Sequence, residues 1–224
     1  MKHRLKGLYV ITDKKLIPRD RFIETVEKAL RGGANVVQLR EKDTPADEVV
    51  ELGKALLKLT RKYGVPLIIN DSIEAAKEIG ADGVHLGEED APVDRAREVL
   101  GEDKIIGVSC YGKIERGINA ERSGADYVAF GTPFFTPTKP ERTPTSFDVL
   151  RVAVSKIKSI PIFAIGGITS KNVDSVLETG VDGIAVITSV FGAEDPEKAA
   201  RGLSSIAERY LKKKGLNPAP KPLY

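Results

Sequence analysis

Short runs of apolar, often β-branched residues alternate along the chain with longer segments that mix apolar and charged positions. Segments such as RFIETVEKALRGG and ADEVVELGKALLKLTRKYG have the apolar spacing of one helix face. Strands that alternate with such helices predict βα units and a parallel sheet. The eight expected strands cover residues 8–12, 36–39, 66–70, 83–86, 105–109, 127–131, 161–165 and 183–188.

A repeated tripeptide supports this count of units. It begins with glycine, ends with asparagine or aspartate and precedes every second strand, at residues 33–35, 80–82, 124–126 and 180–182. A glycine past a helix end terminates the helix in the left-handed conformation, so the repeat reports architecture rather than chemistry. We therefore predict a single-domain (β/α)8 TIM barrel at 1–211 and a basic, proline-containing tail at 212–224. A doubly wound open sheet is the alternative, but the sequence lacks a dinucleotide-binding fingerprint.

Composition narrows the function classes. The 224 residues are 41% hydrophobic and 30% charged, which suits a packed core. The single cysteine excludes an internal disulfide and a cysteine-based zinc site. The net charge of +3 arises from well-mixed signs, and the chain shows neither a basic nucleic-acid-binding stripe nor a membrane-length apolar run. We expect a soluble, cytoplasmic protein, and the sequence leaves homo-oligomer formation open.

Polar residues at the end of the second strand predict an anion-binding site. Active sites of such barrels lie at the carboxyl ends of the strands. Gln38, Arg40 and Lys42 alternate with apolar residues and therefore share one face, which we expect to point toward the barrel mouth. Two cations that point inward favour a strongly anionic ligand such as a diphosphate. The alternative is an ion-pair network with Glu41 and Asp43, which the same alternation places on the opposite face.

Carboxylates in the next two loops suggest a metal ion. The third strand ends in Asn70 and Asp71, and Asp90 lies in the loop after the fourth strand. Mg²⁺ favours one or two carboxylates together with phosphate oxygens and water, so Asp71 and Asp90 are candidate ligands. The alternative for either aspartate is the N-cap of the following helix, and this alternative is serious for Asp90, which stands shortly before Pro92.

The fifth strand and the histidines give little sign of covalent or acid–base catalysis. Ser109 is a candidate hydrogen-bond donor to a phosphate oxygen, with no histidine or lysine beside it to make it a nucleophile. Cys110 reads as a small buried residue. His85 lies within a strand and is better explained as a satisfied core residue than as a general base.

The last three loops predict a second phosphate site. The segment after Gly131 is too long for a simple connection, and Thr136, Thr138 and Lys139 suit a lid that closes over phosphates. A plain surface excursion is the alternative. Phosphate groups often bind barrels between the seventh and eighth loops. Here these loops contain Gly167 and the pair Ile187–Thr188.

Segments LYVITD, VQLREK, IINDSIEAAKEIGADGVHLGEED, GVS, GTPFFTPTKP, PIFAIGGI and GIAVITSVF occur in an order, extending through residue 211, that resembles the thiamine-phosphate synthase family. The resemblance implies that 4-amino-2-methyl-5-hydroxymethylpyrimidine diphosphate and 4-methyl-5-(2-phosphoethyl)thiazole are joined to thiamine phosphate, with release of pyrophosphate. It also implies an Mg²⁺ cofactor and departure of pyrophosphate before the thiazole nitrogen attacks. Such a reaction needs no protein nucleophile.

The resemblance also assigns roles to the candidate residues. It implies that Gln38 contacts the pyrimidine, and that Asp71 and Asp90 hold Mg²⁺. The residues implied to act on the diphosphate are Arg40, Lys42, Asn70, Ser109 and Lys139, and those implied to bind the thiazole phosphate are Thr136, Thr138, Gly167, Ile187 and Thr188.

The chain departs from the family pattern at two positions. Tyr111 stands where relatives often have histidine, and Thr188 stands where they have serine. The nearest rivals are a thiazole tautomerase paralogue, which uses that histidine for proton transfer, and a non-catalytic thiazole phosphate sensor. Tyrosine is a poor substitute for the histidine near neutral pH, because its ordinary pKa is ~10. The joint presence of Lys42, Asp71 and Lys139 argues against the sensor.

Overall fold

The structure is a computed structural model that describes residue 2 and residues 5–131, 134 and 144–216. In these residues the strands form a closed parallel barrel, in which each strand pairs with the next along the chain and β8 pairs with β1. The predicted single-domain (β/α)8 barrel is confirmed, and the open sheet is excluded. The strands are β1 (Gly7–Ile11), β2 (Val36–Leu39), β3 (Leu67–Asn70), β4 (Gly83–Leu86), β5 (Ile105–Tyr111), β6 (Tyr127–Gly131), β7 (Ile162–Ile165) and β8 (Gly183–Val186).

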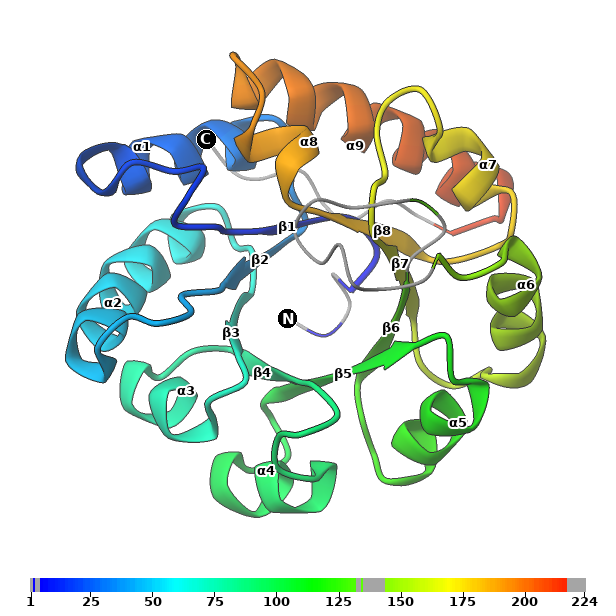
Figure 1. The fold of residues 1–224 in the computed structure, drawn as a ribbon, viewed down its shortest axis with the longest axis horizontal. Helices are drawn as coiled ribbons and strands as arrows, with labels where there is room; N and C mark the ends of the chain where they lie inside the picture. Colours follow the sequence, from blue (N-terminus) through cyan, green and yellow to red (C-terminus); the bar gives the residue numbers. More distant parts are fainter. Residues whose placement is uncertain (1, 3–4, 132–133, 135–143, 217–224) are drawn as a thin grey trace.

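The helices form a ring around the barrel (Figure 1). In the described part of the chain, no helix is long and apolar enough to cross a membrane. The last helix continues beyond residue 211, where the sequence places the end of the barrel. The helical elements are η2 (Arg19–Arg21), α1 (Phe22–Arg31), α2 (Ala46–Lys62), α3 (Ile73–Ile79), α4 (Val93–Leu100), α5 (Ile114–Arg122), α6 (Phe147–Lys156), α7 (Val173–Leu177), α8 (Thr188–Phe191) and α9 (Pro196–Lys213).

Two strands end two residues away from the sequence-based expectation, and the other strand bounds agree with it to within one residue. The fifth strand runs on to Tyr111, because a bulge after Ser109 lets Tyr111 pair with β6. The eighth strand ends earlier than expected, at Val186, and Thr188 begins the short helix α8 instead. Ile187 causes this change, since its φ of −116° and ψ of −80° leave the extended conformation.

The repeated tripeptides form one structural device at the amino ends of the strands. Their glycines terminate helices with φ between 71° and 97°, as the sequence predicts. The last residue of each tripeptide accepts a backbone N–H of the preceding strand at 2.9 Å through its side-chain oxygen. Its own N–H donates back to that residue's carbonyl oxygen. We call these four pairs the Asx clamps: Asn35 with Leu8, Asp82 with Leu67, Asp126 with Ile106, and Asp182 with Ile162.

The apolar core has two layers, which follow from the alternation of side chains along the strands. Val37 and Leu39 belong to the larger layer between strands and helices, as predicted. The smaller layer fills the barrel interior, where the rings of Tyr9, Tyr127 and Phe163 pack edge to face. These rings close the interior, so the open space lies at one end of the barrel.

Candidate active site

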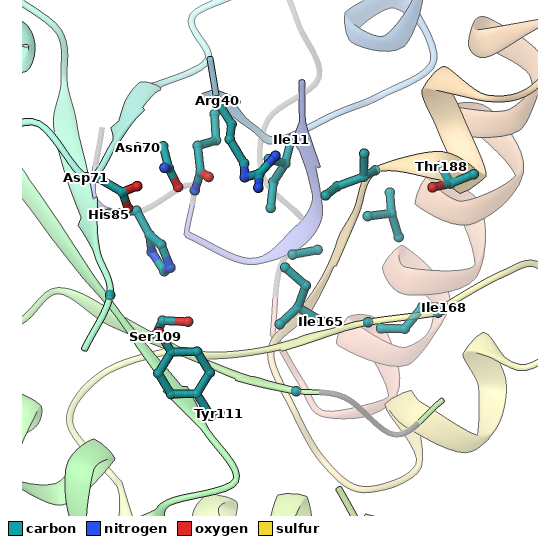
Figure 2. A pocket seen from close by; sticks show the side chains of 18 of the residues that line it. Ile11, Arg40, Asn70, Asp71, His85, Ser109, Tyr111, Ile165, Ile168 and Thr188 are labelled. Carbon is teal, nitrogen blue, oxygen red and sulfur yellow. The ribbon is translucent and has the colours of Figure 1, made fainter. Parts of the chain in front are cut away.

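A cavity of about 900 Å³ opens at the carboxyl ends of the strands. Figure 2 shows Arg40, Asn70 and Asp71 together at one side of this cavity, with Ile168 and Thr188 at the other. The structure therefore brings the two predicted groups of anion-binding residues to one space. The predicted site residues that line it are Gln38, Arg40, Lys42, Asn70, Asp71, Asp90, Ser109, Gly167, Ile187 and Thr188. Thr136, Thr138 and Lys139 lie outside the described residues.

The polar side chains of β2 and its loop face the cavity at different depths. Gln38 is buried, Arg40 is half-buried and Lys42 is exposed. The backbone N–H of Arg40 donates to Thr12 Oγ1 at 2.9 Å, and Arg40 Nη1 lies 3.5 Å from Asp13 Oδ2. Thr12 and Asp13 follow β1, and their part in holding Arg40 is absent from the sequence-based prediction. Their position directly after a strand was the signal available.

The expected opposite face of the second loop is confirmed for Glu41. Its carboxylate lies 3.9 Å from Arg19 and accepts a hydrogen bond from Thr44 at 3.1 Å. Arg19 precedes α1 and Thr44 precedes α2, so Glu41 joins the loop to outer elements. Glu41 therefore does not neutralise Arg40 in the structure. The ion pair of Arg40 is with Asp13.

Neither candidate metal ligand is a helix N-cap. The N-cap of α3 is Ser72, whose hydroxyl accepts the Ala75 N–H at 3.1 Å, while Asp71 holds a left-handed φ of 66°. The N-cap of α4 is Pro92, and Asp90 Oδ2 accepts the Gly87 N–H at 2.6 Å within its own loop. Both carboxylates line the cavity. Capping therefore does not account for either aspartate.

The end of β5 places Ser109 and Tyr111 against the cavity and Cys110 away from it. Figure 2 shows the Ser109 and Tyr111 side chains beside the cavity. Tyr111 has a φ of 55°, and its hydroxyl accepts the Glu88 N–H at 3.3 Å. Cys110 is buried, as the sequence predicts, and burial raises the pKa of its thiol to about 12.

Arg116 on α5 joins the fourth and fifth loops. Its guanidinium donates to the carbonyl oxygens of Ser109 and Gly87, each at 2.7 Å. This contact ties the loop that contains Asp90 to the end of the strand that carries Ser109. The sequence offered no signal for it, because Arg116 lies in an ordinary amphipathic helix.

The seventh and eighth loops are fastened to each other. Gly166 and Gly167 have φ values of 111° and 61°, which only glycine adopts readily. Asn172 donates to the Gly167 carbonyl oxygen at 3.0 Å and accepts the Thr169 N–H at 2.7 Å. The Ser189 hydroxyl on α8 donates to the Ile168 carbonyl oxygen. The predicted site at Gly167, Ile187 and Thr188 is thus one connected surface, although the sequence did not identify Asn172.

Comparison with known proteins agrees with this geometry. The family model described as thiamine monophosphate synthase matches residues 8–190. The chain belongs to this family. It is 47% identical over 201 residues to a thiamine-phosphate synthase of Methylococcus capsulatus, covering 90% of this chain and 89% of that protein. It is 45% identical over 200 residues to one of Roseiflexus castenholzii, covering 89% and 87%.

A solved structure extends the likeness to three dimensions. Thiamine phosphate pyrophosphorylase from Pyrococcus furiosus superposes with a TM-score of 0.85 at 44% identity, covering 94% of this chain and 98% of that one. A 3-hexulose-6-phosphate synthase superposes with a TM-score of 0.67 at 18% identity, which shows a shared fold alone. Membership of the thiamine monophosphate synthase family makes this chain an enzyme, a transferase.

The sequence did not predict that His85, Tyr127 and Tyr9 form one hydrogen-bonded group at the floor of the cavity. His85 is buried, and its Nδ1 lies 2.9 Å from the Tyr127 hydroxyl, as expected for a satisfied core histidine. It also lines the cavity (Figure 2), which the sequence did not suggest. Tyr127 in turn lies 2.9 Å from the Tyr9 hydroxyl. The available signal was alternation, since all three residues stand at inward positions of their strands.

Proposed function

We propose that this chain joins a pyrimidine diphosphate to a thiazole phosphate, giving thiamine phosphate and pyrophosphate. The observation that carries the proposal is that Arg40, Lys42, Asp71 and Asp90 line the same cavity. Two cations and two carboxylates in one space suit a diphosphate together with a divalent cation. The names of the close relatives support the same reaction.

The donor set fits Mg²⁺ as the proposed cation. In the part of the chain that the structure describes, no three His, Cys, Asp or Glu side chains gather into a metal cage. Asp71 and Asp90 alone suit Mg²⁺, which takes its other ligands from phosphate oxygens and water. When bound, this ion supplies positive charge to the leaving diphosphate. Arg40, Lys42 and Asn70 are proposed to hold the other diphosphate oxygens, and Ser109 to donate to one of them.

The proposed reaction is a substitution at the methylene carbon of the pyrimidine. The carbon–oxygen bond breaks first, and its electron pair leaves with pyrophosphate. The thiazole nitrogen then gives its lone pair to that carbon and forms the new carbon–nitrogen bond. Arg40 and Lys42 are proposed to bind the leaving diphosphate, because cations held where negative charge develops stabilise a transition state without rearrangement.

The cavity also suits a short-lived carbocation. Ile11, Ile165, Ile168 and Ile187 line it, and apolar side chains of this kind keep water from the reacting carbon. The buried Cys110 thiol, with its raised pKa, offers no competing nucleophile. We propose that Gln38 contacts the pyrimidine at the floor, where the side chain is buried.

The thiazole phosphate is proposed to bind at the fastened seventh and eighth loops. Gly167, with its left-handed backbone, and the backbone of Ile187 and Thr188 line this side of the cavity. Thr136, Thr138 and Lys139 are proposed to cover the phosphates, with Lys139 acting on the diphosphate. We further propose that the reaction takes place in the cytoplasm, without a nucleic-acid or membrane partner and with homo-oligomer formation left open.

Pyrophosphate release tests the proposal directly. Purified protein is mixed with both substrates and Mg²⁺, and pyrophosphate and thiamine phosphate are followed together. We expect equal amounts of the two products, no release when either substrate is omitted, and loss of turnover when a chelator removes the divalent cation. Conversion of a thiazole tautomer without the pyrimidine would instead support the tautomerase alternative. Tight binding of thiazole phosphate with no release from both substrates would support the sensor.

A further inference from the structure

A chain of hydrogen bonds crosses the barrel interior beneath the cavity. Gln38 Nε2 lies 2.6 Å from the Tyr9 hydroxyl, which lies 2.9 Å from the Tyr127 hydroxyl, which lies 2.9 Å from His85 Nδ1. These residues come from β2, β1, β6 and β4 and are at most 9% exposed. Both ends of the chain, Gln38 and His85, line the cavity.

Each hydroxyl has one hydrogen to donate, so a series of hydrogen bonds in which each hydroxyl accepts one bond and donates the next runs in one direction. Burial raises the pKa of both Tyr9 and Tyr127, which keeps both hydroxyls protonated. Because Gln38 Nε2 donates to Tyr9, Tyr9 donates to Tyr127 and Tyr127 donates to His85 Nδ1. Nδ1 is then an acceptor, and the neutral imidazole carries its hydrogen on Nε2.

Rotating the Gln38 amide by half a turn reverses every bond in the chain. The amide oxygen then accepts from Tyr9, Tyr9 accepts from Tyr127, and Tyr127 accepts from a protonated Nδ1 of His85. We propose that the orientation of the Gln38 amide sets the tautomer of His85 through the two tyrosine hydroxyls. Tyr9 and Tyr127 are thus positioning residues for Gln38 and His85, both of which line the cavity.

Close packing holds the hydrogen-bonded side chains in this arrangement. The Tyr9 and Tyr127 rings meet edge to face with centroids 5.8 Å apart, and His85 stacks on Tyr127 at 5.5 Å. A Cβ at Gly107 would lie 2.0 Å from Tyr127 Cζ and 2.4 Å from its hydroxyl oxygen. Only glycine at this inward position of β5 leaves room for the Tyr127 hydroxyl to lie between Tyr9 and His85.

Nitrogen NMR of the histidine ring reads the tautomer without any need for activity. The chain has two histidines, so a protein labelled with ¹⁵N-histidine gives few signals, and a His3→Gln variant leaves those of His85 alone. At a pH where the imidazole is neutral, we expect protonated Nε2 and unprotonated Nδ1 in the ligand-free protein. A wild-type protein in which Nδ1 of His85 is protonated would overturn the proposed direction of the hydrogen bonds.

Two variants remote from the imidazole test the coupling. Gln38→Glu, once its carboxylate is ionised, can only accept from Tyr9, and we expect it to move the hydrogen of His85 to Nδ1. Tyr9→Phe cuts the chain in the middle and should yield both tautomers. Tyr63→Phe is the matched control, because it removes a hydroxyl that donates to Glu27 at 2.9 Å, outside this chain. Folded variants with the wild-type tautomer would overturn the coupling.

A kinetic readout tests positioning, and this part rests on the proposed function. We expect Tyr9→Phe to raise the KM for the pyrimidine diphosphate by roughly 3- to 10-fold, the effect of about one hydrogen bond, without changing the KM for the thiazole phosphate. An unchanged pyrimidine diphosphate KM beside a shifted tautomer would overturn the positioning role. If the wild type releases no pyrophosphate, the proposed function fails, while the NMR measurement still decides the coupling.

Discussion

The two ends of the barrel use aspartate in opposite ways. At the amino ends of the strands, Asp82, Asp126 and Asp182 each accept a backbone N–H and belong to the Asx clamps. At the carboxyl ends, Asp71 and Asp90 line an open cavity and cap no helix. The residue type is the same, so its role depends on whether it stands just before a strand or in the loop after one.

The surroundings of these aspartates explain the difference. Asp126 also lies 2.9 Å from Arg97 and 2.7 Å from Lys2, and Asp182 lies 2.9 Å from Lys214. Arg97 also donates to the carbonyl oxygens of Gly101, at the end of its own helix α4, and of Gly124, just after α5. These carboxylates are bonded to strands and cations of the fold, whereas Asp71 and Asp90 line the cavity, where Asp90 also accepts the Gly87 N–H.

Backbone strain marks the carboxyl end as well. In the described part of the chain, the non-glycine residues with positive φ are Asp43 and Asp71, in loops after β2 and β3, and Tyr111, the last residue of β5. At the amino end, positive φ in the repeated tripeptides falls on glycine, where it costs little. Strain held by non-glycine residues is typical of functional loops, because the surrounding contacts must compensate for it.

The sharpest test applies the same substitution at both ends. Asp71→Asn removes a charge and keeps a residue that tolerates the left-handed conformation. We expect turnover to fall by roughly 10²- to 10³-fold, as for loss of one electrostatic group in a transition state, with the melting temperature unchanged. Asp82→Asn is the matched control, since an amide oxygen can still accept the Leu67 N–H. Steady-state kinetics and thermal melting measure both effects, and equal activities in the two variants would contradict the assignment.

The next largest effect is expected at the amino end and concerns stability. Asp126→Ala removes the acceptor of the Ile106 N–H and the carboxylate that lies 2.9 Å from Arg97, which keeps the more distant Glu102 at 3.8 Å. We expect a loss of about 2–3 kcal/mol in the free energy of unfolding, measured by urea denaturation, with kcat unchanged in folded protein. Asp126→Asn keeps an acceptor and should lose less. A drop in kcat with unchanged stability would show that the amino end takes part in the chemistry.

Much of this division between the two ends can be predicted from the sequence. Strand order, the repeated tripeptides and the residues after each strand are local patterns, so the barrel and ten of the residues that line the cavity follow from them. Contacts such as Arg116 with Gly87 and Tyr9 with Tyr127 depend on barrel closure and on space left by Gly107. Such contacts join residues that are distant along the chain, and no local pattern encodes them.

Cys110 lies between the two ends of the barrel, in the apolar layer between strands and helices, and gives a prediction for alkaline pH. Burial raises the pKa of the Cys110 thiol to about 12, so the folded state keeps its proton while the unfolded thiol, with an ordinary pKa of ~8.5, loses it. Its contribution to stability is therefore complete below pH ~8.5 and falls as pH rises, by about 1–2 kcal/mol at pH ~10. Urea denaturation across this range measures the loss, and Cys110→Ala should flatten it. Identical pH profiles in the two proteins would contradict burial of the thiol.

The smallest effect is expected at Thr188, the exposed first residue of α8, which lines the cavity where the thiazole phosphate is proposed to bind. Thr188→Ser keeps the hydroxyl and the backbone N–H, so we expect the KM for the thiazole phosphate to change less than ~2-fold, well below the value of one hydrogen bond. Thr188→Val keeps the branched shape and loses the hydroxyl, and should raise that KM several-fold. If both variants bind alike, the backbone alone serves the phosphate. Backbone N–H groups would then be the donors at both ends of the barrel, to the side-chain oxygens of the Asx clamps at one end and to the phosphate at the other.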